Sequence, residues 1–288
     1  MKIAVFGANG QLGRKFQDWN REHSGEHDFV FTDIDTLDIT CKRQIEDFMQ
    51  KHRPQAMINC AAYTAVDKAE DEPESAGKIN HAAVELLSEA ACAHHAFMVH
   101  VSTDYVFDGT QCRPYVESDA TSPVSVYGNT KLKGEQAMQK SGCCGVIIRT
   151  AWLYSEYGNN FVKTMLRLGH EKTQINVVCD QVGTPTYAGD LAEVIMQILN
   201  IRHSIKGVEC YHFSNEGAIS WYDFSQAIMS GARLDCKVMP ILGKDYPAKA
   251  HRPYYSVLDK SKIKQRLSIE IPYWKHSLDK CIRILSAE

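Results

Sequence analysis

Short apolar runs alternate with segments of helical spacing through the first half of the chain. Five runs of mainly apolar residues predict buried strands, at 2–6, 29–33, 56–60, 97–102 and 146–151. Between them, apolar residues recur on one helix face, as Leu12, Phe16 and Trp19 do, so segments 11–23 and 73–93 are expected to be helices. Strands joined by helix-length segments predict βαβ units. The expected fold is therefore α/β, a doubly wound parallel sheet covered by helices on both faces.

The alternation loosens after about residue 152, where helices dominate. Helical spacing is found at 160–170, 187–200, 221–231, 259–267 and 273–285. A strand is expected at 208–214, and the proline-containing stretch 237–253 predicts a loop with a short strand. We therefore expect a sheet domain of residues 1–152 together with roughly 187–214. A smaller C-terminal substrate lobe, of roughly 153–186 and 215–288, should pack on it and form a cleft.

Composition restricts the class of protein without indicating a reaction. With 32 Lys and Arg against 35 Asp and Glu, the formal net charge is −3, so bulk charge gives no reason to expect nucleic acid or an anionic membrane as a partner. A hydrophobic content of 44% excludes disorder. No apolar run approaches the ~18 residues that span a bilayer, and the N-terminal run is too short for a signal peptide. We expect a cytoplasmic protein whose ten cysteines, without a C-x-x-C pair, stay reduced.

A glycine-rich segment, Gly7-Ala8-Asn9-Gly10-Gln11-Leu12-Gly13, follows the first predicted strand and opens the first predicted helix. Glycines there permit a tight turn and let the backbone approach a pyrophosphate, which binds at the helix N-terminus. A purely structural turn is the alternative, but this context is typical of a Rossmann-like dinucleotide site. Asp33 ends the second strand, where a carboxylate would bind the adenine ribose of NAD and repel a 2′-phosphate, whereas Arg14 could offset that repulsion. The choice between NADH and NADPH stays open.

A second motif, Tyr127-Gly128-Asn129-Thr130-Lys131, has the pattern Y-x-x-x-K. Ser122-Pro123 is expected to begin a helix that places Tyr127 and Lys131 one turn apart on one face. A tyrosine, with an ordinary pKa of about 10, is a poor acid–base catalyst at neutral pH unless a neighbouring cation such as Lys131 stabilises its phenolate. Thr103, at the carboxyl end of the fourth strand, is expected in the same crevice, where its hydroxyl could bind a carbonyl oxygen.

The glycine loop, the Y-x-x-x-K pair and the threonine together resemble the extended short-chain dehydrogenase/reductase superfamily and, within it, the dTDP-4-dehydrorhamnose reductase family. The resemblance covers essentially the whole chain, in order, and is weakest near the C-terminus. The segments that carry it are 59–70, 102–109, 120–127, 149–152, 158–165, 180–186 and 252–253.

The resemblance implies an enzyme that uses NADPH or NADH to reduce the C4 ketone of dTDP-4-dehydro-6-deoxy-L-mannose to dTDP-L-rhamnose, the last step of dTDP-rhamnose biosynthesis. It implies that Thr103, Tyr127 and Lys131 form the catalytic set, and that Asn80 helps hold the region of the fourth strand near the cofactor. The implied cofactor contacts, besides Tyr127 and Lys131, are Gly7, Asn9, Gly10, Gln11, Leu12, Gly13, Asp33, Asp38, Ile39, Ala61, Ala62 and Thr64. The implied substrate contacts, besides Thr103, are Asp104 and Trp152 at the sugar, and Asn160, Lys163 and Arg252 at the diphosphate.

One departure from the family concerns a metal. Some members bind magnesium at a dimer interface through two glutamates, and the corresponding positions here are Lys15 and Gly189. Because an ammonium group at Lys15 would repel a metal ion, we expect no metal site and no metal-bridged dimer. The oligomeric state stays open.

Two alternatives to a reductase remain. One is an epimerase or dehydratase of the same fold that acts on a nucleotide sugar. Tyr105 argues against a dehydratase, because such enzymes usually carry glutamate there. The other is a non-catalytic binding subunit, since the regulatory subunit of methionine adenosyltransferase resembles this family. The presence of Thr103, Tyr127 and Lys131 together favours an enzyme, while the preferred ketosugar and nucleotide stay open.

Overall fold

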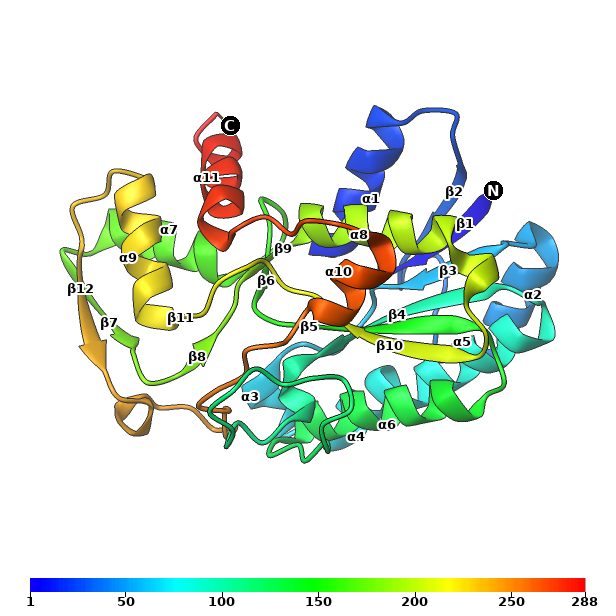
Figure 1. Ribbon diagram of the computed structural model, residues 1–288, viewed down its shortest axis with the longest axis horizontal. Helices are drawn as coiled ribbons and strands as arrows, with labels where there is room; N and C mark the ends of the chain where they lie inside the picture. The colour runs from blue at the N-terminus through cyan, green and yellow to red at the C-terminus, as the bar shows by residue number, and fades with distance from the viewer. Residues whose placement is uncertain (288) are drawn as a thin grey trace.

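The computed structural model describes residues 1–287 and is built around a six-stranded parallel sheet (Figure 1). The strands follow the order β10-β5-β4-β3-β1-β2, and every neighbouring pair is parallel. Their bounds are β1 (Lys2–Phe6), β2 (Asp28–Thr32), β3 (Ala56–Asn59), β4 (Phe97–Thr103), β5 (Gly145–Thr150) and β10 (Val208–His212). The predicted doubly wound α/β sheet is confirmed. Its order changes direction between β1 and β3, so a ligand crevice is expected beyond the carboxyl ends of these strands.

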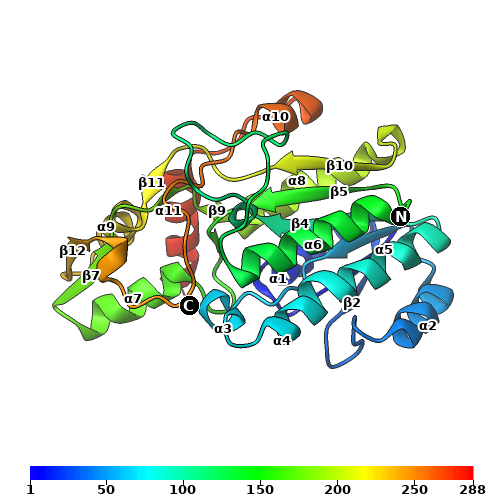
Figure 2. The ribbon, with the colours of Figure 1, turned by 90° about the horizontal axis from the view of Figure 1, so that it is seen from below.

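Helices cover both faces of this sheet, as Figures 1 and 2 show. One face carries α1 (Gln11–Glu22) and α8 (Ala188–Asn200), and the other carries α2 (Lys42–His52), α5 (Ala83–Ala93) and α6 (Val126–Lys140). Successive strand residues point to opposite faces, so Ile3 and Val5 belong to the first core while Ala4 and Phe6 belong to the second. Burial on both faces explains why the strands are continuous apolar runs in the sequence.

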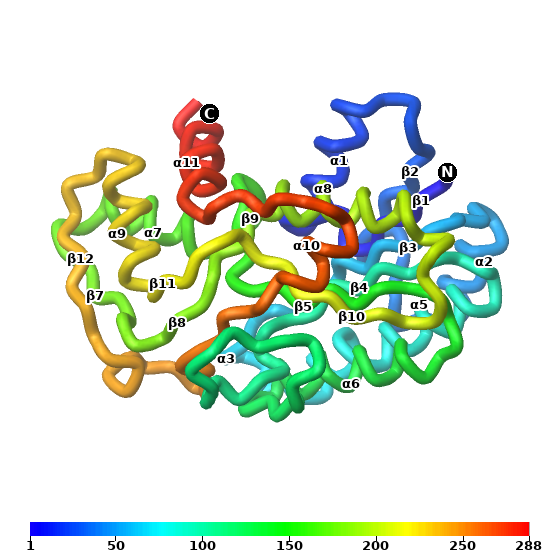
Figure 3. The backbone as a smooth tube through the Cα atoms, viewed as in Figure 1, coloured from blue at the N-terminus to red at the C-terminus, as the bar shows by residue number. Residues whose placement is uncertain are grey.

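The second lobe has its own core and three small two-stranded sheets. Its helices are α7 (Phe161–Glu171), α9 (Trp221–Gly231) and α11 (Trp274–Leu285). Its strands are β6 (Leu153–Tyr154), β7 (Gln174–Val178), β8 (Val182–Gly183), β9 (Thr186–Tyr187), β11 (Ile219–Ser220) and β12 (Lys237–Ile241), paired as β6-β9, β7-β12 and β8-β11. The chain crosses between the lobes repeatedly (Figure 3), because α8, β10 and the short α10 (Ser261–Leu267) return to the main sheet. The substrate crevice is therefore walled by segments far apart in the sequence.

The expected single helix over 73–93 is interrupted. It consists of α4 (Pro73–Gly77), a π-helical turn η1 (Lys78–Ala82) and α5. The wider turn buries Asn80, and α6 packs closely against it, since a Cβ on Gly134 would lie 2.2 Å from the Asn80 carbonyl oxygen. A short helix α3 (Val66–Ala69) precedes this segment.

The expected helix start at Ser122-Pro123 is wrong. The Ser122 N–H donates instead to the carbonyl of Val106, in the short helical turn η2 (Asp104–Val106), at 2.9 Å. Helix α6 begins at Val126, and the Ser125 hydroxyl caps it by accepting from the N–H of Gly128. Tyr127 and Lys131 nevertheless share this helix, as the Y-x-x-x-K spacing predicts. No helix within residues 1–287 is long and apolar enough to cross a membrane.

Candidate active site

Two adjoining cavities lie at the carboxyl ends of the parallel strands and share Gly10, Cys60 and Ala62. The first, the cofactor cavity, has a volume of about 600 Å³. The predicted residues that line it are Gly7, Asn9, Gly10, Asp33, Asp38, Ile39, Ala61 and Ala62. The second, the catalytic cavity, has a volume of about 610 Å³. The predicted residues that line it are Gly10, Gln11, Leu12, Ala62, Thr64, Thr103, Asp104, Tyr127, Lys131, Trp152 and Asn160.

A larger cavity, of about 1140 Å³, opens where the parallel strands begin, among the turns that precede β3, β4 and β5. Arg53, His94, His95, Arg202 and His203 line it. Helices α2, α5, α6 and α8 end at this edge, where the partial negative charge of helix C-termini favours basic residues. We assign it no ligand.

The glycine loop has the backbone geometry that a pyrophosphate site requires. Gly7 has φ +76°, and a Cβ there would lie 2.7 Å from the backbone nitrogen of Ala61. A Cβ on Gly13 would lie 2.4 Å from the carbonyl oxygen of Gly7, so Gly13 lines neither cavity but lets α1 pack against the loop. No side chain caps the start of α1 at Gly10. Its first-turn N–H groups are therefore available to a phosphate.

Asp33 stands at the ribose end of the cofactor cavity. Its Oδ2 accepts from the backbone N–H of Asn9 and its Oδ1 from that of Ile34, both at 2.8 Å. The expected offset by Arg14 is not found, because its guanidinium lies over the ring of Tyr157, 5.1 Å from the centroid. Lys78 is the cation that lines this cavity.

Asp38, in the same cavity, is held by Thr40. Its Oδ1 accepts from the N–H and the hydroxyl of Thr40 at 2.8 and 2.7 Å, and these bonds lower the pKa of Asp38.

The catalytic set predicted from the sequence lies together at one end of the catalytic cavity. Lys131 is 2% exposed and donates from Nζ to the carbonyl of Val101 at 2.7 Å, and burial lowers its pKa to about 8. Burial raises the pKa of Tyr127 to about 12, against the lowering effect of the Thr103 hydroxyl. The expected stabilisation of the Tyr127 phenolate by Lys131 stays a prediction, and both side chains line the catalytic cavity. The phenol stays protonated near neutral pH, as a proton donor must be.

A buried ion pair that sequence analysis missed lies beside Lys131. Glu135, one turn further along α6, accepts from Arg149 Nη2 at 2.7 Å and from the Ser102 hydroxyl at 2.5 Å. Both charged side chains are almost fully buried, at 1% and 6% exposure. The negative charge of Glu135 acts to raise the pKa of Lys131 against the effect of burial. Only the i, i+4 spacing of Lys131 and Glu135 hinted at this contact.

Trp152 forms an aromatic wall of the catalytic cavity, as expected. It stacks on Trp221, with ring centroids 3.5 Å apart and an interplanar angle of 13°. A Cβ on Gly183 would lie 2.8 Å from the Trp152 ring, so this glycine makes room for the indole. Trp221 also lines the cavity and was not predicted, because its partner is 69 positions earlier in the chain.

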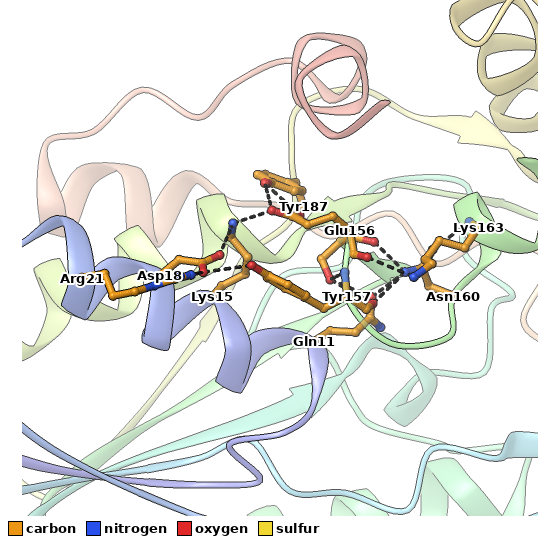
Figure 4. Close-up of polar contacts among 10 residues, drawn as sticks. Gln11, Lys15, Asp18, Arg21, Glu156, Tyr157, Asn160, Lys163 and Tyr187 are labelled. Carbon is orange, nitrogen blue, oxygen red and sulfur yellow. Dashed lines mark hydrogen bonds and ion pairs between the residues drawn. The ribbon is translucent and has the colours of Figure 1, made fainter. Parts of the chain in front are cut away.

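The loop before α7 connects the two lobes at the catalytic cavity (Figure 4). Asn160 lines the cavity, but its Nδ2 donates to Gln11 Oε1 at 2.9 Å and to the Ser155 carbonyl at 2.7 Å, and its Oδ1 caps α7. Lys163 lines neither cavity, and its Nζ donates to the Glu156 carbonyl at 3.1 Å. The expected diphosphate contacts of Asn160 and Lys163 therefore find no support, since Asn160 is engaged by Gln11 of α1 and by Ser155, and Lys163 by Glu156.

Lys15 stabilises the same junction. Its ammonium lies 2.7 Å from Glu156 Oε1 and 2.8 Å from Asp18 Oδ2, and Tyr187 donates to Glu156 at 3.1 Å. These bonds raise the pKa of Lys15 although burial opposes them. Figure 4 shows Lys15 on α1 reaching across to this loop. Residues 1–287 contain no cluster of three or more His, Cys, Asp or Glu side chains arranged to hold a metal.

Two further expectations are revised by the structure. Asn80 accepts from the N–H of Tyr63 at 2.8 Å and donates to Thr130, so it holds the loop after β3, rather than the region of β4, against α6. Arg252 lines neither cavity and forms an ion pair with Asp67 at 2.6 Å. Its guanidinium also acts to lower the pKa of Tyr105, which lines the catalytic cavity.

Comparisons with known proteins agree with this geometry. The family model of the RmlD substrate binding domain matches residues 1–287. A dTDP-4-dehydrorhamnose reductase of Aggregatibacter actinomycetemcomitans is 41% identical, over 96% of this chain and 97% of that protein. The crystal structure of a dTDP-4-dehydrorhamnose reductase from Clostridium acetobutylicum superimposes with a TM-score of 0.94 at 40% identity, covering 99% of this chain and 100% of that one. The Bacillus anthracis enzyme, solved in complex with NADP, has a TM-score of 0.93 at 38% identity, covering 98% and 99%. The chain belongs to the RmlD substrate binding domain family, the family of dTDP-4-dehydrorhamnose reductases.

Proposed function

We propose that this protein reduces the C4 ketone of a dTDP-4-keto-6-deoxy sugar, dTDP-4-dehydrorhamnose, to the alcohol of dTDP-L-rhamnose with NADH or NADPH. The observation that carries the proposal is that Thr103, Tyr127 and Lys131 line one cavity, which adjoins the cavity of the glycine loop. The glycine loop fits the cofactor, because Gly7 and Gly10 line the cavity, Gly13 lets α1 pack against the loop, and the first turn of α1 is uncapped.

The bound nicotinamide would supply a hydride to C4 of the sugar. The groups of this chain supply the rest. Tyr127 donates its phenolic proton to the oxygen that becomes the alcohol, and the raised pKa of the phenol keeps that proton in place near neutral pH. Thr103 donates a hydrogen bond to the same oxygen. The ammonium of Lys131, held by the Val101 carbonyl, would bind the nicotinamide ribose. Trp152 and Trp221 shield the sugar from water.

The direct test is oxidation of NADH or NADPH by the purified protein with dTDP-4-dehydrorhamnose. We expect absorbance at 340 nm to fall in proportion to the ketosugar added, with dTDP-L-rhamnose as product. Omission of the sugar and the Tyr127→Phe protein are the controls. Absence of oxidation, with binding to another protein, would favour the binding-subunit alternative instead. Conversion of the nucleotide sugar without net oxidation of added cofactor would indicate an epimerase or dehydratase.

Cofactor choice is expected to depend on two opposite charges in the cofactor cavity. Asp33 should repel a ribose 2′-phosphate, and Lys78 should attract it. We expect Asp33→Ser to raise the ratio of kcat/KM for NADPH over NADH by about tenfold, a free-energy change of ~1.4 kcal/mol. The matched variant Lys78→Met should lower that ratio. Steady-state kinetics with both cofactors measure this effect, and an unchanged ratio in both variants would contradict it.

A further inference from the structure

Asp104 is a buried acid in the same cavity as the hydroxyl groups of Thr103 and Tyr127. The Thr103 hydroxyl donates to Asp104 Oδ1 at 3.0 Å and accepts from the N–H of Tyr105 at 3.2 Å. The same hydroxyl acts to lower the pKa of the Tyr127 phenol, which lines the same cavity. Asp104 is 1% exposed and lines the catalytic cavity, and within residues 1–287 its Oδ2 has no hydrogen-bond partner. Tyr127, Thr103 and Asp104 therefore line one cavity as neighbours, and Thr103 is hydrogen-bonded to the acid.

The number of hydrogen bonds that the Thr103 hydroxyl can form decides where the protons of Thr103 and Tyr127 can point. A threonine hydroxyl has one proton to donate and two lone pairs that accept. An ionised Asp104 can only accept, so it holds the Thr103 proton in a charge-assisted bond. The N–H of Tyr105 uses one lone pair, which leaves the other for the Tyr127 O–H. In that arrangement the protons of Thr103 and Tyr127 both point away from a ketone in the cavity.

When Asp104 is neutral, the hydrogen bond between Asp104 and Thr103 can reverse its direction, because the carboxylic acid can donate. Its O–H can donate to Thr103, which frees the Thr103 proton, and Tyr127 no longer needs to donate to Thr103. We propose that Asp104 is a positioning residue whose neutral form turns the hydroxyls of Thr103 and Tyr127 toward the ketone oxygen, and that it returns a proton to Tyr127 through Thr103 after reduction. In that return step the Asp104 O–H bond breaks as Thr103 gains its proton. The former Thr103 proton forms the new O–H bond of Tyr127, and solvent later reprotonates Asp104.

The surroundings of Asp104 make its neutral form accessible below about pH 7. Burial raises the pKa of Asp104 to about 6, although the nearby Ser256 hydroxyl, which forms no hydrogen bond to Oδ2 within residues 1–287, and the Thr103 hydroxyl act to lower it. The titratable groups that face it are Tyr105 on its own turn and Tyr127 on α6, and both phenols have raised pKa values and are uncharged near pH 7. Arg252 acts on Tyr105 but is paired with Asp67. Lys131 lines the same cavity, with its ammonium against the Val101 carbonyl.

The inference rests on the proposed reductase function, and the test is the pH dependence of kcat for the full chain with saturating NADH and dTDP-4-dehydrorhamnose. For the wild-type protein we expect kcat to fall about tenfold from pH 5 to pH 7, as Asp104 loses its proton while Lys131, with a pKa of about 8, stays charged. Asp104→Asn keeps a donor toward Thr103 at every pH, so its kcat should vary less than about twofold over this range. The effect should be on kcat rather than on KM. Deuterated cofactor verifies that hydride transfer limits kcat.

A second variant links the effect to Thr103. Thr103→Val removes the hydroxyl, so Thr103→Val alone and with Asp104→Asn should give the same low kcat and no pH-dependent fall. Thermal unfolding of each variant verifies that it is folded. A pH profile of Asp104→Asn that parallels the wild type, or a fall that persists in Thr103→Val, would overturn the inference. Absence of ketosugar-dependent oxidation by the wild-type protein at every pH would instead overturn the proposed function.

Discussion

Replacement of Tyr127 by phenylalanine is expected to lower kcat by about 10²- to 10⁴-fold, the usual worth of general acid catalysis. The phenol is the donor at the catalytic cavity that is protonated near neutral pH and borders Thr103. Without its proton, the oxygen that takes up negative charge during reduction has only the weaker donor Thr103. Cofactor affinity should be nearly unchanged, because the glycine loop and Lys131 are left intact. Steady-state kinetics with a fluorescence titration of NADH measure the two quantities.

A second tyrosine gives a matched control for that variant. Tyr154 is 1% exposed in the core of the second lobe, and its hydroxyl has no hydrogen-bond partner within residues 1–287. Tyr154→Phe therefore removes the same atom without leaving an unpaired group, and kcat should stay within about twofold of the wild type. Full turnover in Tyr127→Phe, or an equal loss in Tyr154→Phe, would contradict the assignment of Tyr127 as proton donor.

The parts of the site that follow from local spacing could be predicted from the sequence. The glycine segment needs only a strand before it and a helix after it, and Gly7 and Gly13 have the close backbone contacts that the pattern predicts. Tyr127 and Lys131 face one cavity because they are four residues apart on a helix, although the helix begins at Val126 rather than at Ser122-Pro123. The hydrogen bonds of Ser125 and Ser122 determine where the helix begins, and the spacing of residues in the sequence does not reveal such bonds.

The parts of the site that depend on contacts between distant segments could not be predicted. Trp221 reaches Trp152 only because α9 packs against the cavity. The need for a glycine at position 183 becomes clear only when the Trp152 indole is seen against it. Asn160 has the residue type of a diphosphate ligand, but its amide is used by Gln11 and Ser155. A residue's chemistry indicates which bonds it can make, whereas the tertiary structure decides which of them it does make.

The buried pair of Glu135 and Arg149 is expected to produce the largest stability effect of any substitution near the site. Arg149→Met leaves the Glu135 carboxylate buried without its main partner. Glu135→Leu likewise leaves the Arg149 guanidinium buried without its carboxylate partner. Each should lower the free energy of unfolding by about 3–5 kcal/mol. The double variant leaves no unpaired charge, so its loss should be well below the sum of the two single losses. Urea denaturation measures these values. The exposed pair of Arg167 and Glu171 is the matched control, and Arg167→Ala should cost less than about 1 kcal/mol.

The same pair should also affect catalysis through Lys131. Burial lowers the pKa of Lys131 to about 8, and the charge of Glu135 acts to raise it. Removing that charge in Glu135→Gln should lower the pKa of Lys131 further, so that a larger fraction of the lysine is uncharged at pH 7.5. At pH 7.5 we then expect weaker NADH binding and a lower kcat than in the wild type, with recovery as the pH is lowered to about 6 and Lys131 regains its charge. A deficit that is equal at both pH values would show that Glu135 acts only through the packing of Arg149.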